Sequence, residues 1–453
     1  MSEKSPCLFV VFGATGDLNK RKLLPALFRL SQRGVLEGCH ILGVARSTDM
    51  DDTRFRKLAR EVIEEATSDW CDACLHYRSL NENLADDIVK LEKENNLPGN
   101  RVYYLALPPD AFGPTVELIG RSGLNKSAGW TRLVVEKPFG RDLQSAQELN
   151  ALIHSFFDES QIYRIDHYLG KETVQNLLVF RFANPVFESL WNRNHIDNVL
   201  ITVAEELGVE KRAGYYDETG ALRDMVQNHL TQVLSLIAME VPARLDAEAV
   251  RDEKAKVLRS IAPIKKEDVV FGQYYGYREE PGVPKDSQAE TLVALKLDIV
   301  NWRWNRVPFY LRTGKRLAKQ TSEIAITFRR PPVSVFEPFG SSCEVQNNVL
   351  LITIQPDEGF NLRFQVKSPG QPVKLATQEL DFHYSEAFSS IPEGYETLLQ
   401  DILVGEQSLF VRADWIELSW RLYDPLLKSP PDIHFYEPGS WGPPEADRLI
   451  ARS

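Results

Sequence analysis

An acid, an imidazole, a phenol and an ammonium group stand within six consecutive residues, from Asp166 to Lys171. A glycine precedes the lysine, and an apolar pattern with helical spacing follows over residues 174–182. Lys171 is therefore expected at the first turn of a helix, where backbone N–H groups without acceptors favour an anion. Together with His167 and Tyr168, it could donate hydrogen bonds to one phosphate group. The segment indicates an anion site beside an ionisable carboxylate, and a polar loop leading into a solvated helix cap is the alternative interpretation.

A glycine turn near the start of the chain has the order of elements that a pyrophosphate site needs. The apolar run Cys7–Phe12 predicts a strand, the turn follows as Gly13-Ala-Thr-Gly16, and a helical pattern begins near residue 17. Glycines let backbone N–H groups approach phosphate oxygens, and the helix N-terminus favours their negative charge. The spacing is G-x-x-G and not the full G-x-G-x-x-G, so an ordinary turn is the alternative to a dinucleotide site.

The second expected strand ends in an arginine, where an acidic residue would indicate NAD. The run His40–Val44 is followed by Ala45, Arg46 and Ser47, with no Asp or Glu at the tip. In NAD-selective folds an acid at this position accepts a hydrogen bond from the ribose 2′-hydroxyl, whereas an arginine pairs with a 2′-phosphate. The sequence therefore favours NADP over NAD, unless Arg46 is only a surface residue of the loop.

Two further ionisable residues, Lys137 and His229, are candidates for ligand binding or catalysis. Lys137 follows the apolar strand expected over residues 132–136, at the carboxyl end where open parallel sheets bind ligands. His229 lies in the helical pattern of residues 220–239 and shares its apolar stripe. A histidine in such a stripe is either a catalyst or a hydrogen-bonded core residue. Its distance along the chain from Asp166 does not show whether the two side chains meet.

The composition narrows the class of protein. The chain has 453 residues, of which 43% are hydrophobic and 26% are charged, as is typical of a globular protein with two or three domains. The net charge of −11 argues against nucleic-acid binding but is compatible with a local basic cluster for a small anion. All apolar runs are far shorter than the ~20 residues of a membrane span. The first of them is better explained by a strand than by a signal peptide.

The cysteines point to a reducing environment. Five cysteines are too few and too scattered for a disulfide framework, so a cytoplasmic location is expected. Cys71 and Cys74 form a C-x-x-C pair with His76 nearby, but no second pair follows at the spacing of a zinc site. We therefore expect two ordinary, half-buried thiols there and no bound metal.

The pattern of hydrophobic residues differs between the first and the last part of the chain. In the first part, apolar runs alternate with amphipathic stretches, which is typical of a parallel sheet with crossover helices. In the last part, strand-like runs follow one another without helices between them, which predicts a mainly antiparallel sheet. We therefore predict an α/β, Rossmann-like domain over residues 1–165 and a larger α+β domain over residues 166–453. The expected strands are 7–12, 40–44, 101–107, 132–136, 291–299, 307–312, 323–329, 348–355 and 362–367, and the expected helices are 17–32, 51–65, 110–121, 142–157, 220–239, 393–404 and 413–427.

Several segments, in this order along the chain, resemble the glucose-6-phosphate dehydrogenase family. They are GATGDLNKRK (13–22), EKPFG (136–140), RIDHYLGK (164–171), RDMVQNH (223–229), VPFYLRTGK (307–315), Gln355-Pro356 and GSWGPPEAD (439–447). The resemblance extends over nearly the whole chain, and the octapeptide at 164–171 is highly specific for this family. Thr15 replaces a more usual serine and keeps its hydroxyl.

The resemblance implies an enzyme that oxidises C1 of glucose 6-phosphate to 6-phosphogluconolactone, the first step of the oxidative pentose phosphate pathway. It implies NADP as the coenzyme, with NAD as a secondary coenzyme in some relatives. By matching positions, His229 would be the general base for the C1 hydroxyl, Asp166 would orient its imidazole, and His167, Tyr168 and Lys171 would hold the phosphate. The other residues implied near the sugar are Lys137, Glu205, Asp224, Arg312, Lys315 and Gln355. Those implied along the coenzyme are Gly13, Thr15, Gly16, Asp17, Leu18, Arg46, Tyr104 and Lys137.

Two other classes of protein are alternatives to this family. Other sugar oxidoreductases also join a Rossmann domain to an open sheet and carry a Glu-Lys-Pro segment, but they do not need the His-Tyr-x-x-Lys cluster. A catalytically silent, cofactor-binding regulator would have little reason to keep Asp166, His167, Lys171 and His229. The family habit is a homodimer or homotetramer formed through the large sheet, whose exposed face needs covering. Neither a nucleic acid nor a membrane is expected as a partner.

Overall fold

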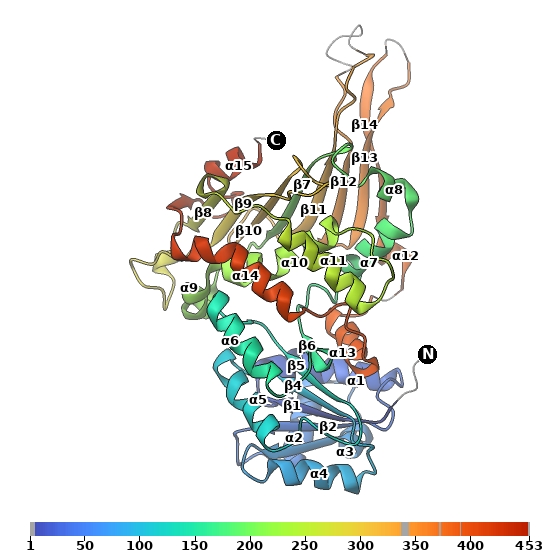
Figure 1. Ribbon diagram of the computed structural model, residues 1–453, viewed down its shortest axis with the longest axis vertical. Helices are drawn as coiled ribbons and strands as arrows, with labels where there is room; N and C mark the ends of the chain where they lie inside the picture. The colour runs from blue at the N-terminus through green and yellow to red at the C-terminus, as the bar shows by residue number, and fades with distance from the viewer. Residues whose placement is uncertain (1–4, 337–343, 371–372, 390, 452–453) are drawn as a thin grey trace. The chain divides into compact units, whose positions relative to one another are not determined.

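The computed structural model describes residues 5–336, 344–370, 373–389 and 391–451 of the chain. These residues form two compact units (Figure 1). Unit 1 contains residues 1–170, 244–251 and 392–417, and unit 2 contains residues 171–243, 252–391 and 418–453. The first unit therefore includes two segments that come from much later in the chain.

A six-stranded parallel sheet forms the centre of unit 1, in the order β3-β2-β1-β4-β5-β6. Its strands are β1 (Leu8–Phe12), β2 (His40–Ala45), β3 (Leu75–Ser79), β4 (Arg101–Leu105), β5 (Thr131–Val135) and β6 (Ile162–Arg164). All residues of β1 and β4 are buried, because helices cover both faces of a parallel sheet. The expected Rossmann-like domain is confirmed, although the sequence pattern did not indicate the short strands β3 and β6.

The helices of unit 1 connect these strands and surround the sheet (Figure 1, blue to cyan). They are the π-helical segment η1 (Asn19–Leu23) with α1 (Leu24–Gln32), then α2 (Asp52–Val62), α3 (Ser68–Cys74), α4 (Leu84–Glu94), α5 (Phe112–Arg121) and α6 (Leu143–His154). The returning helix α13 (Gly394–Val404) joins them, with Leu398, Leu399 and Ile402 in the same hydrophobic core as β1 and α1. Cys71 is buried and Cys74 partly buried, and burial raises the pKa of both thiols.

Two histidines on neighbouring strands of unit 1 predict a stability that falls in acid. His40 Nδ1 and His76 Nε2 lie 3.0 Å apart, so the pair shares one N–H proton when both rings are neutral. Burial, opposed by Asp52, lowers the pKa of His76 to about 4. The unfolded chain binds this proton near pH ~6.5, so folding stability is present above that pH and is lost as pH falls toward 4.

Proton binding by His76 in the unfolded chain is expected to lower the free energy of unfolding by about 2 kcal/mol between pH 6.5 and pH 4. Urea titrations of the wild type and of His76→Gln at several pH values measure the difference, with the exposed His195→Gln as the matched control. A wild type and a His76→Gln variant that lose stability equally in acid would contradict the prediction.

A nine-stranded sheet forms the centre of unit 2, in the order β14-β13-β12-β11-β7-β10-β9-β8-β15. Its strands are β7 (Ile196–Ala204), β8 (Val269–Tyr274), β9 (Leu292–Asp298), β10 (Pro308–Gly314), β11 (Thr321–Phe328), β12 (Val349–Gln355), β13 (Gly359–Lys367), β14 (Leu375–His383) and β15 (Ile433–Tyr436). Two neighbouring pairs, β7 with β10 and β8 with β15, are parallel, and the other pairs are antiparallel. The sheet is therefore mixed but mostly antiparallel, as expected.

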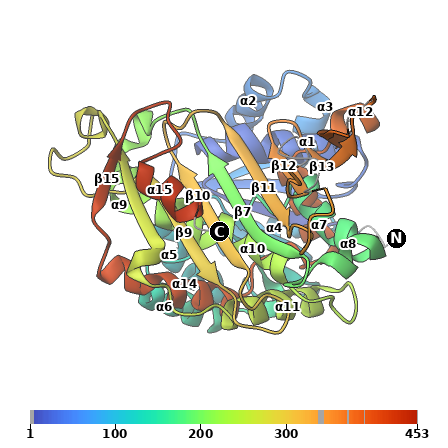
Figure 2. The ribbon, with the colours of Figure 1, turned by 90° about the horizontal axis from the view of Figure 1, so that it is seen from above.

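In the view of Figure 2, α10 of unit 2 lies behind the strands β7 and β10, whereas α15 lies in front of the sheet. The α- and π-helices of this unit are α7 (Glu172–Phe182), α8 (Pro185–Leu190), α9 (Ala213–Ala221), the π-helical segment η5 (Leu222–Leu230), α10 (Thr231–Ala238), α12 (Tyr384–Ala387) and α15 (Pro444–Ile450). Helices α11 (Ala247–Arg259) and α14 (Ala413–Lys428) each have one part in either unit. Among the helices of the described residues, none is both long enough and apolar enough to cross a membrane.

Candidate active site

The glycine turn after β1 has the geometry expected of a phosphate-binding loop. Gly13 has φ +89°, and a Cβ there would lie 2.1 Å from the carbonyl oxygen of Ala106, so only glycine fits. The Gly16 N–H donates to the Gly13 carbonyl (2.9 Å), and the side chain of buried Asn19 donates to the Ala14 carbonyl (2.6 Å). These bonds close the turn directly before a helix, whose first N–H groups have no acceptor within the helix.

The side chains around this turn leave it open to a ligand. Thr15 and Leu18 are partly exposed and Asp17 is exposed, with its carboxylate 2.9 Å from the guanidinium of Arg21. Arg46 follows the end of β2 and is also exposed. β2 lies beside β1, so the turn and Arg46 are at the same carboxyl edge of the sheet.

Tyr104 and Glu136 form a buried pair behind the turn. The Tyr104 side chain is fully buried in the core, and its hydroxyl donates to Glu136 Oε1 (2.6 Å). Tyr395 donates to the same oxygen (3.2 Å), and burial raises the pKa of the Glu136 carboxyl. Tyr104 is therefore a buried residue of β4 that supports the segment carrying Lys137, and its place along the coenzyme stays a prediction.

The loop after β6 holds the first part of the octapeptide in a tight turn. Asp166 is buried, and its Oδ1 accepts from the Tyr168 N–H (3.0 Å). A Cβ at Gly170 would lie 2.4 Å from the Gly394 carbonyl oxygen, so the start of α13 packs directly on this turn. His167 is partly exposed beside the largely buried Tyr168, with ring centroids 5.0 Å apart.

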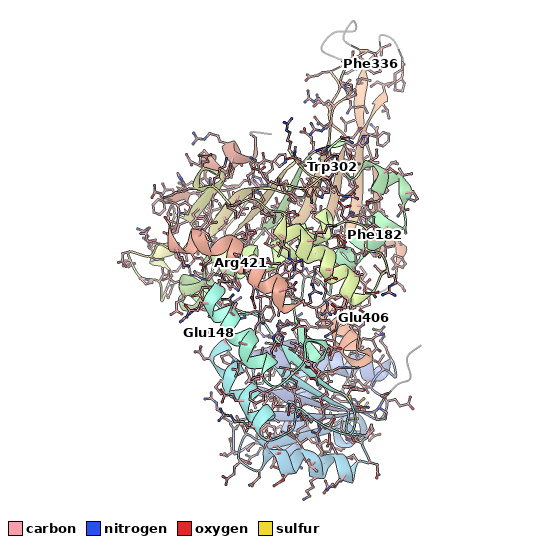
Figure 3. All side chains as sticks on the ribbon, viewed as in Figure 1. Glu148, Phe182, Trp302, Phe336, Glu406 and Arg421 are labelled. Carbon is pink, nitrogen blue, oxygen red and sulfur yellow. The ribbon has the colours of Figure 1, made fainter. Side chains whose placement is uncertain are left out.

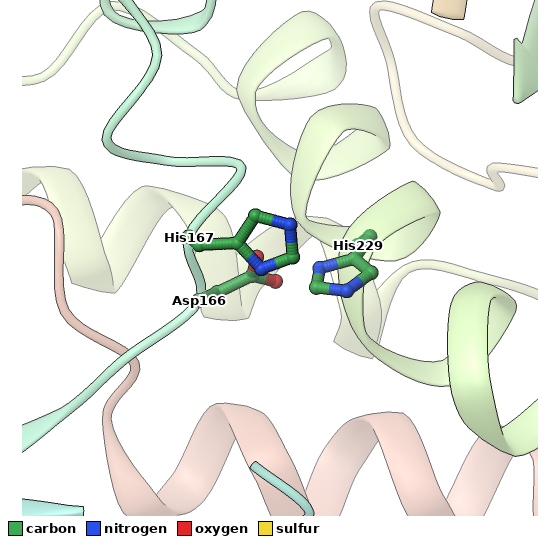
Figure 4. A group of neighbouring side chains, drawn as sticks. All are labelled: Asp166, His167 and His229. Carbon is green, nitrogen blue, oxygen red and sulfur yellow. The ribbon is translucent and has the colours of Figure 1, made fainter. Parts of the chain in front are cut away.

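Figure 4 draws Asp166 and His167 on this loop, and His229 on η5 of unit 2. Acidic and imidazole atoms of Asp166 and His167 come within 4.8 Å of one another.

The N-terminus of α7 is not the open anion position that the sequence suggested. Lys171 is the N-cap residue, and the helix begins at Glu172. The Thr173 N–H donates to Glu358 Oε2 (3.0 Å), and the Thr173 hydroxyl donates to the same oxygen. A carboxylate of the chain itself therefore occupies this helix end, because orphan N–H groups attract any available anion. Any phosphate bound by Lys171 must be held mainly by side chains.

Three residues implied near the sugar lie at the carboxyl ends of strands in the sheet of unit 2. Glu205 follows β7 and Lys315 follows the parallel strand β10, whose last residues are paired in register. Lys315 Nζ forms an ion pair with Glu205 Oε2. Gln355 ends β12, which is antiparallel to β11 and so runs in the direction of β7. Strand topology thus brings together Glu205 and Lys315, which are 110 positions apart, whereas β11 lies between the strand of Gln355 and that of Glu205.

The segment η5 holds Asp224 and His229 in a buried environment. Asp224 is 7% exposed and His229 is 1% exposed, and the His229 N–H donates to Asn228 Oδ1 (2.5 Å). Tyr216 on the preceding helix α9 was not suggested by the sequence. Burial raises its pKa, and the negative charge of Asp224 adds to this effect. Lys315 Nζ lies 5.4 Å from the Tyr216 ring centre, so this tyrosine joins α9 to the strand edge.

Arg312, which the resemblance also implies near the sugar, contacts the C-terminal segment of the chain. Its guanidinium lies 4.8 Å from the ring centre of Trp441 and 3.6 Å from Asp447. Successive side chains of a strand point to opposite faces, and Arg312 points to Trp441 whereas Lys315 points to Glu205. The Arg312 side chain therefore contacts the C-terminal segment, and its role near the sugar stays a prediction.

A parallel sheet with a phosphate-type glycine loop, joined to a unit with a polar sheet edge, defines a class: the oxidoreductases that use a nicotinamide dinucleotide. Residues 10–176 match the family description "Glucose-6-phosphate dehydrogenase, NAD binding domain", and residues 178–453 match "Glucose-6-phosphate dehydrogenase, C-terminal domain". The chain belongs to the glucose-6-phosphate dehydrogenase family, as the sequence motifs predicted.

Individual relatives agree over the whole length. The chain is 46% identical to the glucose-6-phosphate 1-dehydrogenase of Aggregatibacter actinomycetemcomitans, over 99% of this chain and 96% of the relative. It is similar to a solved glucose-6-phosphate dehydrogenase in complex with glucose 6-phosphate, with a TM-score of 0.92 at 37% identity, covering 100% of this chain and 98% of that one. The enzyme from Mycobacterium avium gives a TM-score of 0.86 at 39% identity, covering 98% and 97%.

Proposed function

We propose that this chain oxidises glucose 6-phosphate at C1 and passes a hydride to NADP⁺. The observation that carries the proposal is the Glu205–Lys315 ion pair at the carboxyl ends of β7 and β10, in a chain whose full length matches this family. A carboxylate and an ammonium group side by side suit the hydroxyl groups of a sugar. Gln355, at the end of β12, is proposed to add an amide. Together with Asp224 and Lys137, they would orient the ring.

The residues of this chain divide the work of the reaction. His229 removes the proton from the C1 hydroxyl onto an imidazole nitrogen, while the hydrogen on C1 leaves with its electron pair and a C1=O bond of the lactone forms. Asp166 orients that imidazole and stabilises its protonated form. His167, Tyr168 and Lys171 hold the phosphate, as charge-assisted hydrogen-bond donors. The nicotinamide, when bound, supplies the hydride acceptor.

The loop after β1 is proposed to hold the coenzyme. Backbone N–H groups of the turn from Gly13 to Leu18 would approach the pyrophosphate, and Arg46 would pair with a 2′-phosphate. Support comes from the geometry of Gly13 and from the absence of an acid at the end of β2. NADP is therefore proposed as the main coenzyme, NAD as a secondary one, and no metal.

A spectrophotometric assay at 340 nm tests this function. We expect reduction of NADP⁺ with glucose 6-phosphate, at a kcat/KM well above that with free glucose or with sugar phosphates lacking an oxidisable C1. We also expect a higher kcat/KM with NADP⁺ than with NAD⁺, because only NADP⁺ gives Arg46 a phosphate partner. Equal rates with glucose and glucose 6-phosphate would contradict the substrate assignment, and a preference for NAD⁺ would contradict the role of Arg46.

A homodimer or homotetramer in the cytoplasm is proposed for the assembled enzyme. Large apolar side chains are exposed on unit 2, including Trp302, labelled in Figure 3, which is 86% exposed, and Leu380 and Phe382 on β14. Such side chains and an uncovered strand face are typical of surfaces that associate.

A further inference from the structure

Glu290 is a buried carboxyl group that the proposed reaction does not use. It precedes β9 and is 8% exposed. Its Oε1 accepts a hydrogen bond from the Leu222 N–H (2.9 Å), and its main-chain carbonyl accepts from the Ala221 N–H (2.9 Å). One residue thus accepts two adjacent N–H groups at the start of η5, the segment that carries Asp224 and His229.

The chain is shaped to receive this carboxylate. Gly220 has φ +67° and ψ 170°, which separates α9 from η5. A Cβ at Gly220 would lie 2.3 Å from Glu290 Oε1, so the carboxyl packs directly on the glycine backbone. Burial raises the pKa of Glu290 to about 7, against the opposing effect of the Leu222 N–H. Burying a carboxyl group is unfavourable, and only glycine fits at position 220 beneath it. The contact between Glu290 and Gly220 is therefore a specific feature of this fold.

Thr291, the residue after Glu290, contacts Lys315 and Tyr436. The Thr291 carbonyl accepts from the Lys315 N–H (2.9 Å). The Thr291 hydroxyl lies 3.0 Å from the Tyr436 hydroxyl, which donates to the Lys315 carbonyl (2.7 Å). Residues 290 and 291 therefore connect the start of η5 on one side with Lys315 on the other.

We propose that Glu290 is a positioning residue that fixes the start of η5, and through it the placement of Asp224 and His229 relative to Lys315. The roles of these three residues rest on the proposed function. The contacts of Glu290 do not depend on it. Asp224 is two residues and His229 seven residues beyond Leu222 in one continuous segment, so a shift at Leu222 moves both. Small displacements of a general base are costly, because proton transfer needs close alignment.

Three variants at this position separate the hydrogen bond from the charge. Glu290→Ala removes the acceptor, and we expect kcat to fall about tenfold, with the KM for NADP⁺ unchanged because its loop belongs to unit 1. Glu290→Gln keeps an acceptor oxygen, so we expect kcat within about threefold of wild type. Glu290→Asp keeps the charge but moves the acceptor oxygen away from the Leu222 N–H, so we expect its kcat to lie between those of Glu290→Ala and Glu290→Gln. If Glu290→Ala does not fold, Glu290→Asp takes its place in the test.

A primary isotope effect shows whether the base is displaced. With glucose 6-phosphate deuterated at C1, we expect the isotope effect on kcat to rise in Glu290→Ala and Glu290→Asp but not in Glu290→Gln, because a displaced base makes C–H cleavage more rate-limiting. The matched control is Glu188→Ala, which removes the partner of Arg303 (2.8 Å) and Arg181 (3.2 Å) in unit 2. It is expected to lower thermal stability with kcat and isotope effect unchanged.

The proposal is overturned if Glu290→Ala, or Glu290→Asp where the alanine variant does not fold, loses stability but keeps wild-type kcat and isotope effect. It is also overturned if Glu290→Gln is as impaired as Glu290→Ala. Failure of the proposed function is a separate result, because it shows as a wild-type enzyme without glucose 6-phosphate activity.

Discussion

Replacing His229 with asparagine is expected to lower kcat by about 10²–10⁴ while the KM for glucose 6-phosphate stays within about threefold. The imidazole is the proposed acceptor for the C1 hydroxyl proton, and asparagine keeps a polar side chain of similar size without basicity. An imidazole can accept a proton near neutral pH, as a general base must. Binding depends on other residues, so the loss should fall on kcat.

The pairing with Asp166 is tested by a double variant. Asp166→Asn alone should lower kcat, because it no longer stabilises the protonated imidazole. Adding it to His229→Asn should cause little further loss, since the two residues act as a unit. The exposed His195→Asn is the control and should match wild type. A kcat near the wild-type value in His229→Asn would show that His229 is not the general base. Additive losses of kcat in the double variant would show that Asp166 and His229 do not act together.

The first unit was largely predictable because its signals are local. Strands such as Leu8–Phe12 are apolar throughout, and a glycine turn and a helix follow directly. β3 was missed since its sequence, LHYRS, is short and partly polar, and β6 has only three residues. The helix at 394–404 was expected, but its place in unit 1 was not. That place depends on long-range contacts, such as Arg29 Nε to Glu396 Oε1 (2.6 Å), which leave no local pattern.

The site shows the same division. The resemblance suggested Glu205 and Lys315 one by one, and only strand order explains why they meet. The sequence did not predict Glu290 or Tyr216, because neither a buried acid before a strand nor a tyrosine in a helix forms a recognisable motif.

Two other residues show how a contact can override a position in the sequence. Arg312 lies in the same segment as Lys315, yet strand alternation turns it toward Trp441. Glu358 fills the helix end beside Lys171, although the two residues are far apart in the sequence.

Truncating Lys171 to alanine is expected to raise the KM for glucose 6-phosphate about 30- to 100-fold, because a charge-assisted hydrogen bond to the phosphate is lost. Glu358 occupies the N-terminus of α7, so the helix offers little compensation for the missing ammonium group. The kcat at saturation should change much less, since Lys171 does not touch the reacting carbon. Activity on free glucose should be unchanged, because glucose has no phosphate for Lys171 to hold.

The ratio of kcat/KM for glucose 6-phosphate to that for glucose measures this contribution directly, because effects on folding or on the coenzyme cancel in the ratio. Lys285→Ala is the matched control, as this exposed lysine of unit 2 donates to the Arg278 carbonyl (3.1 Å). If Lys171→Ala keeps the wild-type ratio, Lys171 does not bind the phosphate. His167 and Tyr168 would then have to hold it alone, and substituting either should lower the ratio further than the loss of one neutral hydrogen bond, about 0.5–1.5 kcal/mol, would predict.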